Sequence, residues 1–153
     1  MPYQNPQTFM VSLKILLRNK KGECLIMASP DLAVSFKNCY DLPGGRINDN
    51  EVETPFIKLI DREIKEEVGE NIKYKLRKDP VALTKYRFKN GDCALYVLFE
   101  AKYLNGTIKI SGEHTSFCWK KLNKKNIKNI FHPKYARLLK NYFDWNQGIK
   151  VKL

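Results

Sequence analysis

The chain has 153 residues, the length of one ordinary domain, and we expect a single domain over residues 1–153 with one sizeable core. Hydrophobic residues make up 43% and charged residues 29% of the sequence, a balance that argues against a disordered chain. Lys and Arg number 28 against 16 Asp and Glu, which gives a formal net charge of +12. Because most of these cations are lysines and no recognition motif accompanies them, the charge does not favour specific nucleic-acid binding.

The N-terminal segment has no basic leader before its short apolar run, so it does not resemble a secretory signal. That run, residues 11–17, is interrupted by Lys14 and is too short to span a bilayer. We therefore expect a soluble, cytoplasmic protein without a membrane partner. The cysteines form no C-x-x-C pair and the chain has only two histidines, so zinc-ligand spacing is absent. We therefore expect the thiols to be reduced and mostly buried. The four cysteines are Cys24, Cys39, Cys93 and Cys118.

In chain order, the first predicted elements are two strands within residues 10–29, around a turn at residues 19–22. The following segment, NCYDLPGGRINDNE at residues 38–51, is predicted to be a loop. Its proline and paired glycines adopt backbone geometries that are closed to other residues.

A helix is predicted to begin near residue 54, with Thr54 as its N-cap and Pro55 at the first helical position. Gly69 is the expected helix stop. Apolar residues recur at three- and four-residue spacing and predict one buried stripe. The stripe consists of Ile57, Ile60, Ile64 and Val68.

Two strand-like runs follow, VALTKYRF at 81–88 and CALYVLFEAKY at 93–103, and Asn90-Gly91 between them is a strong hairpin signal. A turn at Asn105-Gly106 leads into TIKI and then TSFCWKKL. A second helix is predicted near residues 132–143. Its apolar face comprises Tyr135, Leu138, Leu139 and Tyr142. Strands before and after a central helix, with another helix at the end, predict an α/β fold with a mixed sheet covered on both faces.

The first predicted helix carries four glutamates within a sector of roughly 100°, beside its apolar stripe. These are Glu63, Glu66, Glu67 and Glu70. Like charges at this spacing repel one another by a few tenths of a kcal/mol per pair, and divalent cations relieve that repulsion because Mg²⁺ prefers carboxylate oxygens. The alternative is a solvated helix face, since glutamate is a good helix former.

The segment LPGGRINDNEVETPFIKLIDREIKEEVG, residues 42–69, resembles the Nudix box, G-x5-E-x7-R-E-U-x-E-E-x-G-U, in which U is apolar. Gly45 matches the opening glycine, and Gly44 belongs to the approach that usually precedes it. The closing half matches without a gap at Arg62, Glu63, Ile64, Glu66, Glu67 and Gly69. Three extra residues separate Gly45 from Arg62, so either Glu51 or Glu53 is the first box glutamate. Glu70 replaces the final apolar residue.

The resemblance implies a Nudix-type α/β/α sandwich, a mixed β-sheet with the loop-helix of the box and a C-terminal helix. It also implies a MutT-like hydrolase that cleaves a nucleoside diphosphate linked to another group, using Mg²⁺ or Mn²⁺. By the family pattern, Glu63, Glu66 and Glu67 hold the metal, and the Gly45 carbonyl adds a ligand. Arg62 is then structural and pairs with Glu51 or Glu53.

The general base is expected to be a carboxylate near the metal. Glu66 and Glu67 are candidates within the box, and Glu113 matches the place where many relatives carry a further ligand or base. Glu100 is a fourth candidate at the end of a strand-like run. We favour Glu113, because base-bearing loops vary more than strands do.

Substrate choice lies outside the box. The candidate substrate-binding residues are Arg46 and Tyr86, and Tyr86 lies 16 residues beyond Glu70, a spacing that resembles a marker of dinucleoside polyphosphate hydrolases. Other aromatic residues that could stack on a base, or simply pack in the core, are Phe36, Tyr40 and Phe88. The chain most resembles the branch that hydrolyses (d)NTPs, with dinucleoside polyphosphates or ADP-ribose as alternatives.

A different class of function is a non-catalytic Nudix-fold module that binds a nucleotide or RNA. The intact glutamate set argues against it, because a pure binder does not need metals beside a scissile bond. Nudix proteins are often dimers, so a homodimer is compatible with this chain by analogy.

Overall fold

The computed structural model describes residues 4–28, 30 and 40–146, so Phe36 and Cys39 lie outside the described residues. One mixed sheet with the strand order β3-β2-β1-β6-β4 runs through this part of the chain, with β5 also pairing with β6 and β7 with β2. The strands are β1 (Met10–Arg18), β2 (Cys24–Ala28), β3 (Tyr40–Asp41), β4 (Lys73–Leu76), β5 (Ala82–Arg87), β6 (Cys93–Asn105) and β7 (Ser116–Lys120). The helical elements are η1 (Asp49–Glu51), α2 (Phe56–Glu67), α3 (Ile127–Ile130) and α4 (Pro133–Asn146).

The centre of the sheet is the parallel pair β1 and β6, which stay in register from Met10 opposite Ala94 to Arg18 opposite Lys102. The remaining strand pairs are antiparallel. The predicted hairpin is confirmed: Gly91 has φ +92, and Phe88 N–H donates to the Asp92 carbonyl at 2.8 Å. The first two predicted strands are also confirmed as β1 and β2.

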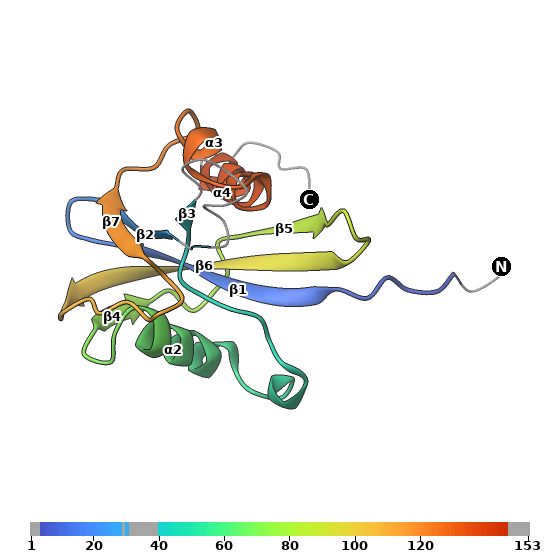
Figure 1. The fold of residues 1–153 in the computed structure, drawn as a ribbon, viewed down its shortest axis with the longest axis horizontal. Coiled ribbons are helices and arrows are strands. Elements are labelled where there is room, and N and C mark those ends of the chain that lie inside the picture. The colour runs from blue at the N-terminus through green and yellow to red at the C-terminus, as the bar shows by residue number, and fades with distance from the viewer. Residues whose placement is uncertain (1–3, 29, 31–39, 147–153) are drawn as a thin grey trace.

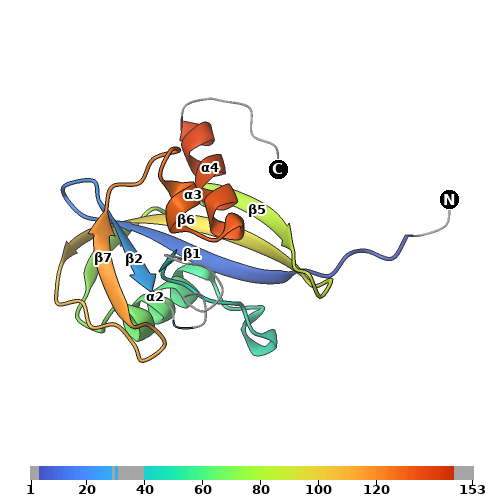
Figure 2. The same cartoon turned by 45° about the horizontal axis from the view of Figure 1, so that its top comes forward.

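Helix α2 covers one face of the sheet, and α3 and α4 cover the other (Figure 1; Figure 2 shows the same layers after a turn). Side chains alternate along β1, so Leu13, Ile15 and Leu17 pack toward α2. Leu16 belongs instead to the core beneath α4. The predicted apolar face of the last helix is buried there, as Tyr135, Leu138, Leu139 and Tyr142. The α/β/α sandwich predicted from the sequence is therefore confirmed.

Helix α2 begins one residue later than predicted, with Pro55 and not Thr54 at the N-cap. The Pro55 carbonyl accepts hydrogen bonds from the first turn, and a proline can occupy this cap since no N–H of its own is needed. The predicted burial of Ile57 is wrong, because this side chain is 49% exposed. The buried stripe is rotated toward the glutamates, and it consists of Leu59, Ile60, Glu63, Ile64 and Glu67.

The helix stops as predicted near Gly69, which has φ +139, and Gly69 N–H donates back to the Ile64 carbonyl at 3.0 Å. The short strand β4 was not predicted, because its alternation KYKL covers four residues and two of them are lysines. The run TIKI forms no strand. Its backbone instead ties to the end of α2, where Lys109 N–H donates to the Val68 carbonyl at 2.7 Å.

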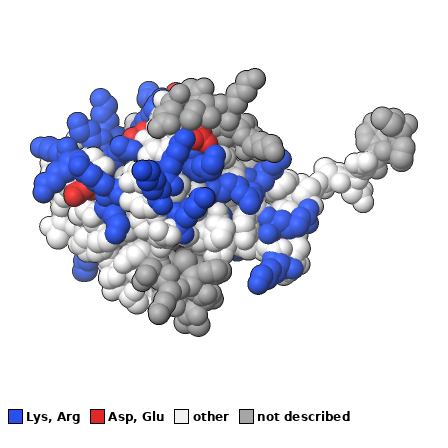
Figure 3. All heavy atoms as spheres, turned by 90° about the horizontal axis from the view of Figure 1, so that it is seen from above, with Lys and Arg blue, Asp and Glu red and all other residues white. Residues whose placement is uncertain are grey.

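Lys and Arg side chains cover much of the side that carries α3 and α4, with few acidic side chains among them (Figure 3). Asp144 of α4 is buried and pairs with both Lys124 and Lys140. None of the described helices combines the length and the apolarity needed to cross a bilayer. Among the described residues, Cys24 and Cys93 are buried free thiols and Cys118 is a half-buried one.

Candidate active site

A cleft of about 800 Å³ opens where the diglycine loop meets the second half of α2. The segment at residues 111–114 and the beginning of α4 complete its walls. The segment before β7 runs alongside α2 in the ribbon views (Figure 1). Two residues of β1, Pro30 and Tyr96 of β6 also line the cleft, so it gathers residues from seven separate stretches of the chain.

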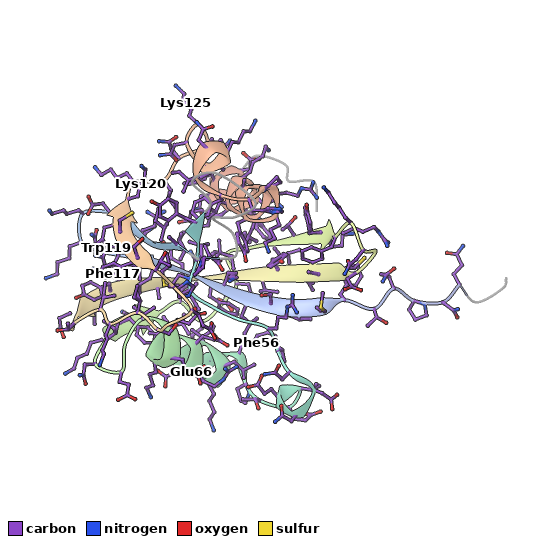
Figure 4. The ribbon with its side chains drawn as sticks, viewed as in Figure 1. Phe56, Glu66, Phe117, Trp119, Lys120 and Lys125 are labelled. Atoms are coloured by element: carbon purple, nitrogen blue, oxygen red, sulfur yellow. The ribbon has the colours of Figure 1, made fainter. Side chains whose placement is uncertain are left out.

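Three of the predicted metal ligands line this cleft from one face of α2. Glu63 and Glu67 are buried, with 7% and 9% of their surface exposed. Glu66, labelled in Figure 4, has a side chain that is 58% exposed. Glu70 follows the end of the helix and is exposed, so it does not line the cleft. The helical spacing thus brings together the three glutamates of the box and leaves the fourth outside.

The diglycine loop approaches these glutamates closely, and at Gly44 only glycine fits, because its φ is +130 and backbone atoms lie against it. Gly44 N–H donates to Glu67 Oε2 at 2.7 Å, and a Cβ on Gly44 would lie 2.1 Å from the Leu13 carbonyl oxygen. A Cβ on Gly45 would lie 2.5 Å from Glu63 Oε1. The Gly45 carbonyl accepts a hydrogen bond from Leu13 N–H at 2.9 Å, so the loop is also fixed to β1.

Lys14 is a residue of this site that the sequence interpretation missed. Only 4% of it is exposed, and its ammonium donates to Asp41 Oδ1 at 3.0 Å and Oδ2 at 3.1 Å. It also donates to the carbonyls of Leu42, at 3.2 Å, and Gly44, at 3.1 Å. An inward-facing lysine in an apolar strand was the available signal, since a buried ammonium needs such partners. Lys14 thereby fastens the loop to the centre of β1.

Arg62 connects the loop to the helix. Its guanidinium contacts Glu51 Oε1 at 2.9 Å, Glu63 Oε1 at 3.0 Å and Glu66 Oε2 at 3.2 Å. Glu51 also accepts a hydrogen bond from the backbone of Asn48 at 2.9 Å. Glu53 is exposed, and its carboxylate has no ion pair or hydrogen bond within the described part of the chain. Of the two alternatives for the arginine's partner, the structure brings only Glu51 to it.

The negative charge of the buried carboxylates is only partly balanced by their neighbours. Burial, together with the charge of Glu67, raises the pKa of Glu63 to about 7, although Arg62 and Lys14 oppose the shift. An oxygen-rich set of this kind fits a hard divalent cation, which would restore the favourable interactions that the carboxylates lose on burial. Gly45 leaves the space beside the Glu63 carboxylate open, because a Cβ there would come within 2.5–2.8 Å of it.

The segment before β7 brings Glu113 and His114 next to Glu67 at the end of α2. Glu113 is exposed, and its carboxylate has no ion pair or hydrogen bond in the described residues. The His114 side chain is 5% exposed, and its Nε2 lies 3.5 Å from Glu67 Oε1. The neighbouring Glu67 carboxylate raises the pKa of His114. The sequence interpretation missed His114, and its position next to the candidate base Glu113 was the signal for it.

Glu100, the remaining candidate base, is not in the cleft. It pairs with Arg18 at 3.3 Å and accepts a hydrogen bond from the Tyr142 hydroxyl at 3.2 Å. Glu100 therefore has a structural role on another part of the sheet, where it lines a separate hollow.

The candidate substrate-binding residues fall in two neighbouring hollows. Arg46 lines the cleft and also a groove of about 580 Å³ that contains Tyr86 and Phe88. The Tyr86 ring packs edge-on against Phe88 at 5.2 Å and against His132 at 5.7 Å. Tyr40, at the start of β3, is half-buried against the core beneath α4. Arg46 is therefore the link between the acidic cleft and the aromatic groove.

No protein-family model matches the sequence, and no curated protein matches it. Solved structures do match. A MutT protein from Methanosarcina mazei Go1 superposes with a TM-score of 0.69 at 20% identity, over 94% of this chain and 99% of that one. An Ap4A hydrolase from C. elegans has a TM-score of 0.63 at 20% identity (92% and 99%), and a NUDIX hydrolase from Nitrosomonas europaea has 0.63 at 14% identity (95% and 94%). The chain has the Nudix hydrolase fold.

Within the Nudix fold, the three extra residues of the box fall between Glu51 and α2. Since η1 ends at Glu51, this interval is the turn at residues 52–55, which belongs to the loop that extends beyond the start of α2 (Figure 1). Added loop length costs little free energy, and Glu51 keeps its contact with Arg62. The insertion consequently leaves the arrangement of Glu63, Glu66 and Glu67 intact.

Proposed function

We propose that the protein is a Nudix pyrophosphohydrolase that uses Mg²⁺ or Mn²⁺ to cleave a nucleoside diphosphate linked to another group. The observation that carries this proposal is the meeting of three glutamates of one helix with the diglycine loop in a single cleft. The solved structures that share the fold include proteins described as MutT and as an Ap4A hydrolase, which agrees with this reaction class.

Glu63, Glu66 and Glu67 would hold the cation, with the Gly45 carbonyl as a further candidate ligand. When bound, the cation would neutralise part of the polyphosphate charge and lower the pKa of a water that it holds. Arg62 positions this set, because it contacts Glu63 and Glu66 while Glu51 anchors it to the loop. Gly44 N–H orients Glu67 through its 2.7 Å hydrogen bond.

Glu113 is the base that the contacts support. Glu66 is engaged by Arg62 and Glu67 by Gly44 N–H, and hydrogen bonds to a carboxylate lower its basicity. Glu113 carries no such contact in the described residues and lines the same cleft as the glutamates of α2. It can therefore accept the proton of the attacking water.

The substrate best supported is a (d)NTP, hydrolysed in the manner of MutT. Arg46 and Lys134 line the cleft and offer cations to a polyphosphate, and Arg46 leads on to the groove that contains Tyr86. A nucleobase stacked near Tyr86 would place the phosphates of its nucleotide toward the glutamates. Dinucleoside polyphosphates and ADP-ribose are the alternative substrates that the same arrangement accommodates.

The test is a panel of (d)NTPs, ADP-ribose, NADH and diadenosine polyphosphates, assayed with Mg²⁺ and with Mn²⁺. We expect metal-dependent release of pyrophosphate or phosphate, and a loss of kcat of at least about 100-fold in Glu67→Gln, since even residues that only support a metal ligand cost 10- to 100-fold. Glu53→Gln is the matched control and should keep wild-type activity. Tight nucleotide binding without turnover across the whole panel would contradict the proposal and favour a non-catalytic binding module.

A further inference from the structure

A second group of candidate metal-binding side chains includes Glu67. Glu67, Glu113 and His114 each offer one ligand atom, and these atoms all lie within 4.8 Å of one another. Glu67 and the imidazole of His114 are buried, while Glu113 is exposed. The group differs in kind from the three glutamates of α2 because it contains a nitrogen ligand.

The imidazole of His114 is buried, and its contact with Glu67 is a long ion pair without hydrogen-bond geometry. Its side chain is 5% exposed, and neither Nδ1 nor Nε2 has a hydrogen-bond partner among the described residues. A buried polar group left unpaired costs about 1–3 kcal/mol. The Nε2 atom faces Glu67 Oε1 at 3.5 Å, which is too long for a strong hydrogen bond and leaves space near both atoms. An ion between them would satisfy both.

The backbone holds this histidine in place at both ends of its segment. Lys109 N–H donates to the Val68 carbonyl at 2.7 Å, next to Glu67 at the end of α2. Thr115 N–H donates to the Ala28 carbonyl at 2.8 Å and begins the pairing of β7 with β2. Between these ties, His114 N–H closes a turn onto the Ser111 carbonyl at 3.2 Å. The His114 side chain therefore lies next to Glu67 on a segment whose backbone is fixed at both ends.

We propose that Glu67, Glu113 and His114 form a metal position that binds Mn²⁺, Co²⁺ or Zn²⁺ in preference to Mg²⁺. Glu113 gives one carboxylate oxygen to this ion, and its other oxygen stays free for the role of base proposed above. Glu67 is shared with the α2 glutamates, so this inference deepens the proposed function and rests on it for the neighbouring ion. Two ligands of one ion at about 2.1 Å lie no more than about 4.2 Å apart. The 4.8 Å spread therefore requires a small closing movement, which the exposed Glu113 side chain can supply.

The preference follows from the chemistry of the ligands. Mg²⁺ selects oxygen atoms and rarely takes imidazole, whereas Mn²⁺, Co²⁺ and Zn²⁺ accept it. Glu67 presents one oxygen to Gly44 N–H and the other to His114, so its carboxylate is oriented to bridge two neighbouring positions. We expect Mn²⁺ to bind at this position at least about tenfold more tightly than Mg²⁺, and Co²⁺ and Zn²⁺ more tightly again.

The test detects the nitrogen directly, with no turnover required. Pulsed EPR of the Mn²⁺-loaded protein should show ¹⁴N modulation from one imidazole. His114→Gln should abolish this modulation, while His132→Gln, which removes the other histidine of the chain, should retain it. Calorimetric titration should show that His114→Gln weakens Mn²⁺ binding at one position by at least tenfold and changes Mg²⁺ binding less than threefold.

A second measurement uses the unaltered protein, in case His114→Gln does not fold. Long-range ¹H–¹⁵N spectra of the wild type should show the ring nitrogens of one histidine shifting when Zn²⁺ is added. Mn²⁺ that binds without any nitrogen signal, or a signal that persists in folded His114→Gln, would overturn the proposal. Nitrogen coordination without hydrolysis of any substrate would refute the proposed function alone, and hydrolysis without nitrogen coordination would refute this inference alone.

Discussion

The sharpest test of the site geometry is the substitution Gly45→Ala. A Cβ on Gly45 would lie 2.5 Å from Oε1 and 2.8 Å from both Oε2 and Cδ of Glu63. Non-bonded carbon atoms are in contact at about 3.5–4.0 Å, so the Glu63 carboxylate must withdraw by about 0.7–1.2 Å. The backbone of Gly45 is not in the left-handed region, and the substitution therefore introduces no backbone strain of its own.

A displacement of this size is large for a metal ligand and small for the fold. Metal–ligand distances are held within about 0.2 Å, and a misplacement of about 1 Å in a catalytic site costs about 100-fold in rate. We therefore expect Gly45→Ala to lower kcat by about 100-fold. Replacing glycine by alanine also restricts the unfolded chain, which favours folding by about 0.4–1 kcal/mol and offsets part of the local crowding, so stability should change little.

The assay combines steady-state kinetics, calorimetric titration with Mg²⁺ and thermal denaturation. Gly112→Ala is the matched control, because a Cβ there has nothing within 4 Å and its backbone also lies outside the left-handed region. It should stay within about threefold of wild type in kcat. If Gly45→Ala keeps wild-type kcat and metal affinity while folding normally, then Glu63 is not a metal ligand and the reasoning fails.

Three further outcomes are expected. The raised pKa of Glu63 means that the folded metal-free protein binds this proton more tightly than the unfolded chain, so stability falls as the pH rises from about 4.5 to about 7. In urea denaturation with chelator, Glu63→Gln should gain about 1–2 kcal/mol of unfolding free energy at pH 8, after allowance for screening in the open cleft, and little at pH 4.5. An equal effect at both pH values would contradict this. Mg²⁺ at about 100 times its Kd should stabilise the wild type by about 2.7 kcal/mol, which corresponds to a rise in Tm of roughly 5–10 °C. An equal rise in Glu67→Gln would show that Glu67 is not a metal ligand. Glu51→Gln should lower the free energy of unfolding by about 1–2 kcal/mol, because it weakens the contact with Arg62 and the hydrogen bond from Asn48 N–H. The control Glu53→Gln should stay within about 0.5 kcal/mol of wild type. Equal losses of the two variants in thermal denaturation would show that the Arg62 contact is not specific.

The elements that the sequence predicted well depend on local rules. Asn90-Gly91 selects a tight turn through the backbone freedom of glycine, and that turn is present with Gly91 at φ +92. The apolar residues of α4 recur with the helical period, and they are buried as expected. The strand β4 escaped prediction because its pairing with β6, and not its own four residues, decides its structure.

The rotation of α2 is an example of tertiary structure overriding a local pattern. Periodicity placed Ile57 in the buried stripe, yet this residue is 49% exposed, while Glu63 and Glu67 are buried in the same helix. The hydrogen bond from Gly44 N–H to Glu67 and the close packing of Gly45 on Glu63 hold these polar groups inward. Apolar periodicity could not anticipate this, because contacts from a distant loop compensate the burial of charge.

The sequence by itself determined which carboxylates share a helix face, since 3.6 residues per turn sets the spacing of Glu63, Glu66 and Glu67. Only the tertiary structure decided that Arg62 pairs with Glu51, and that His114 lies beside Glu67. Contacts within a helix follow from the geometry of one segment. Contacts between segments depend on how the sheet and its loops pack in space, and no local pattern specifies that packing.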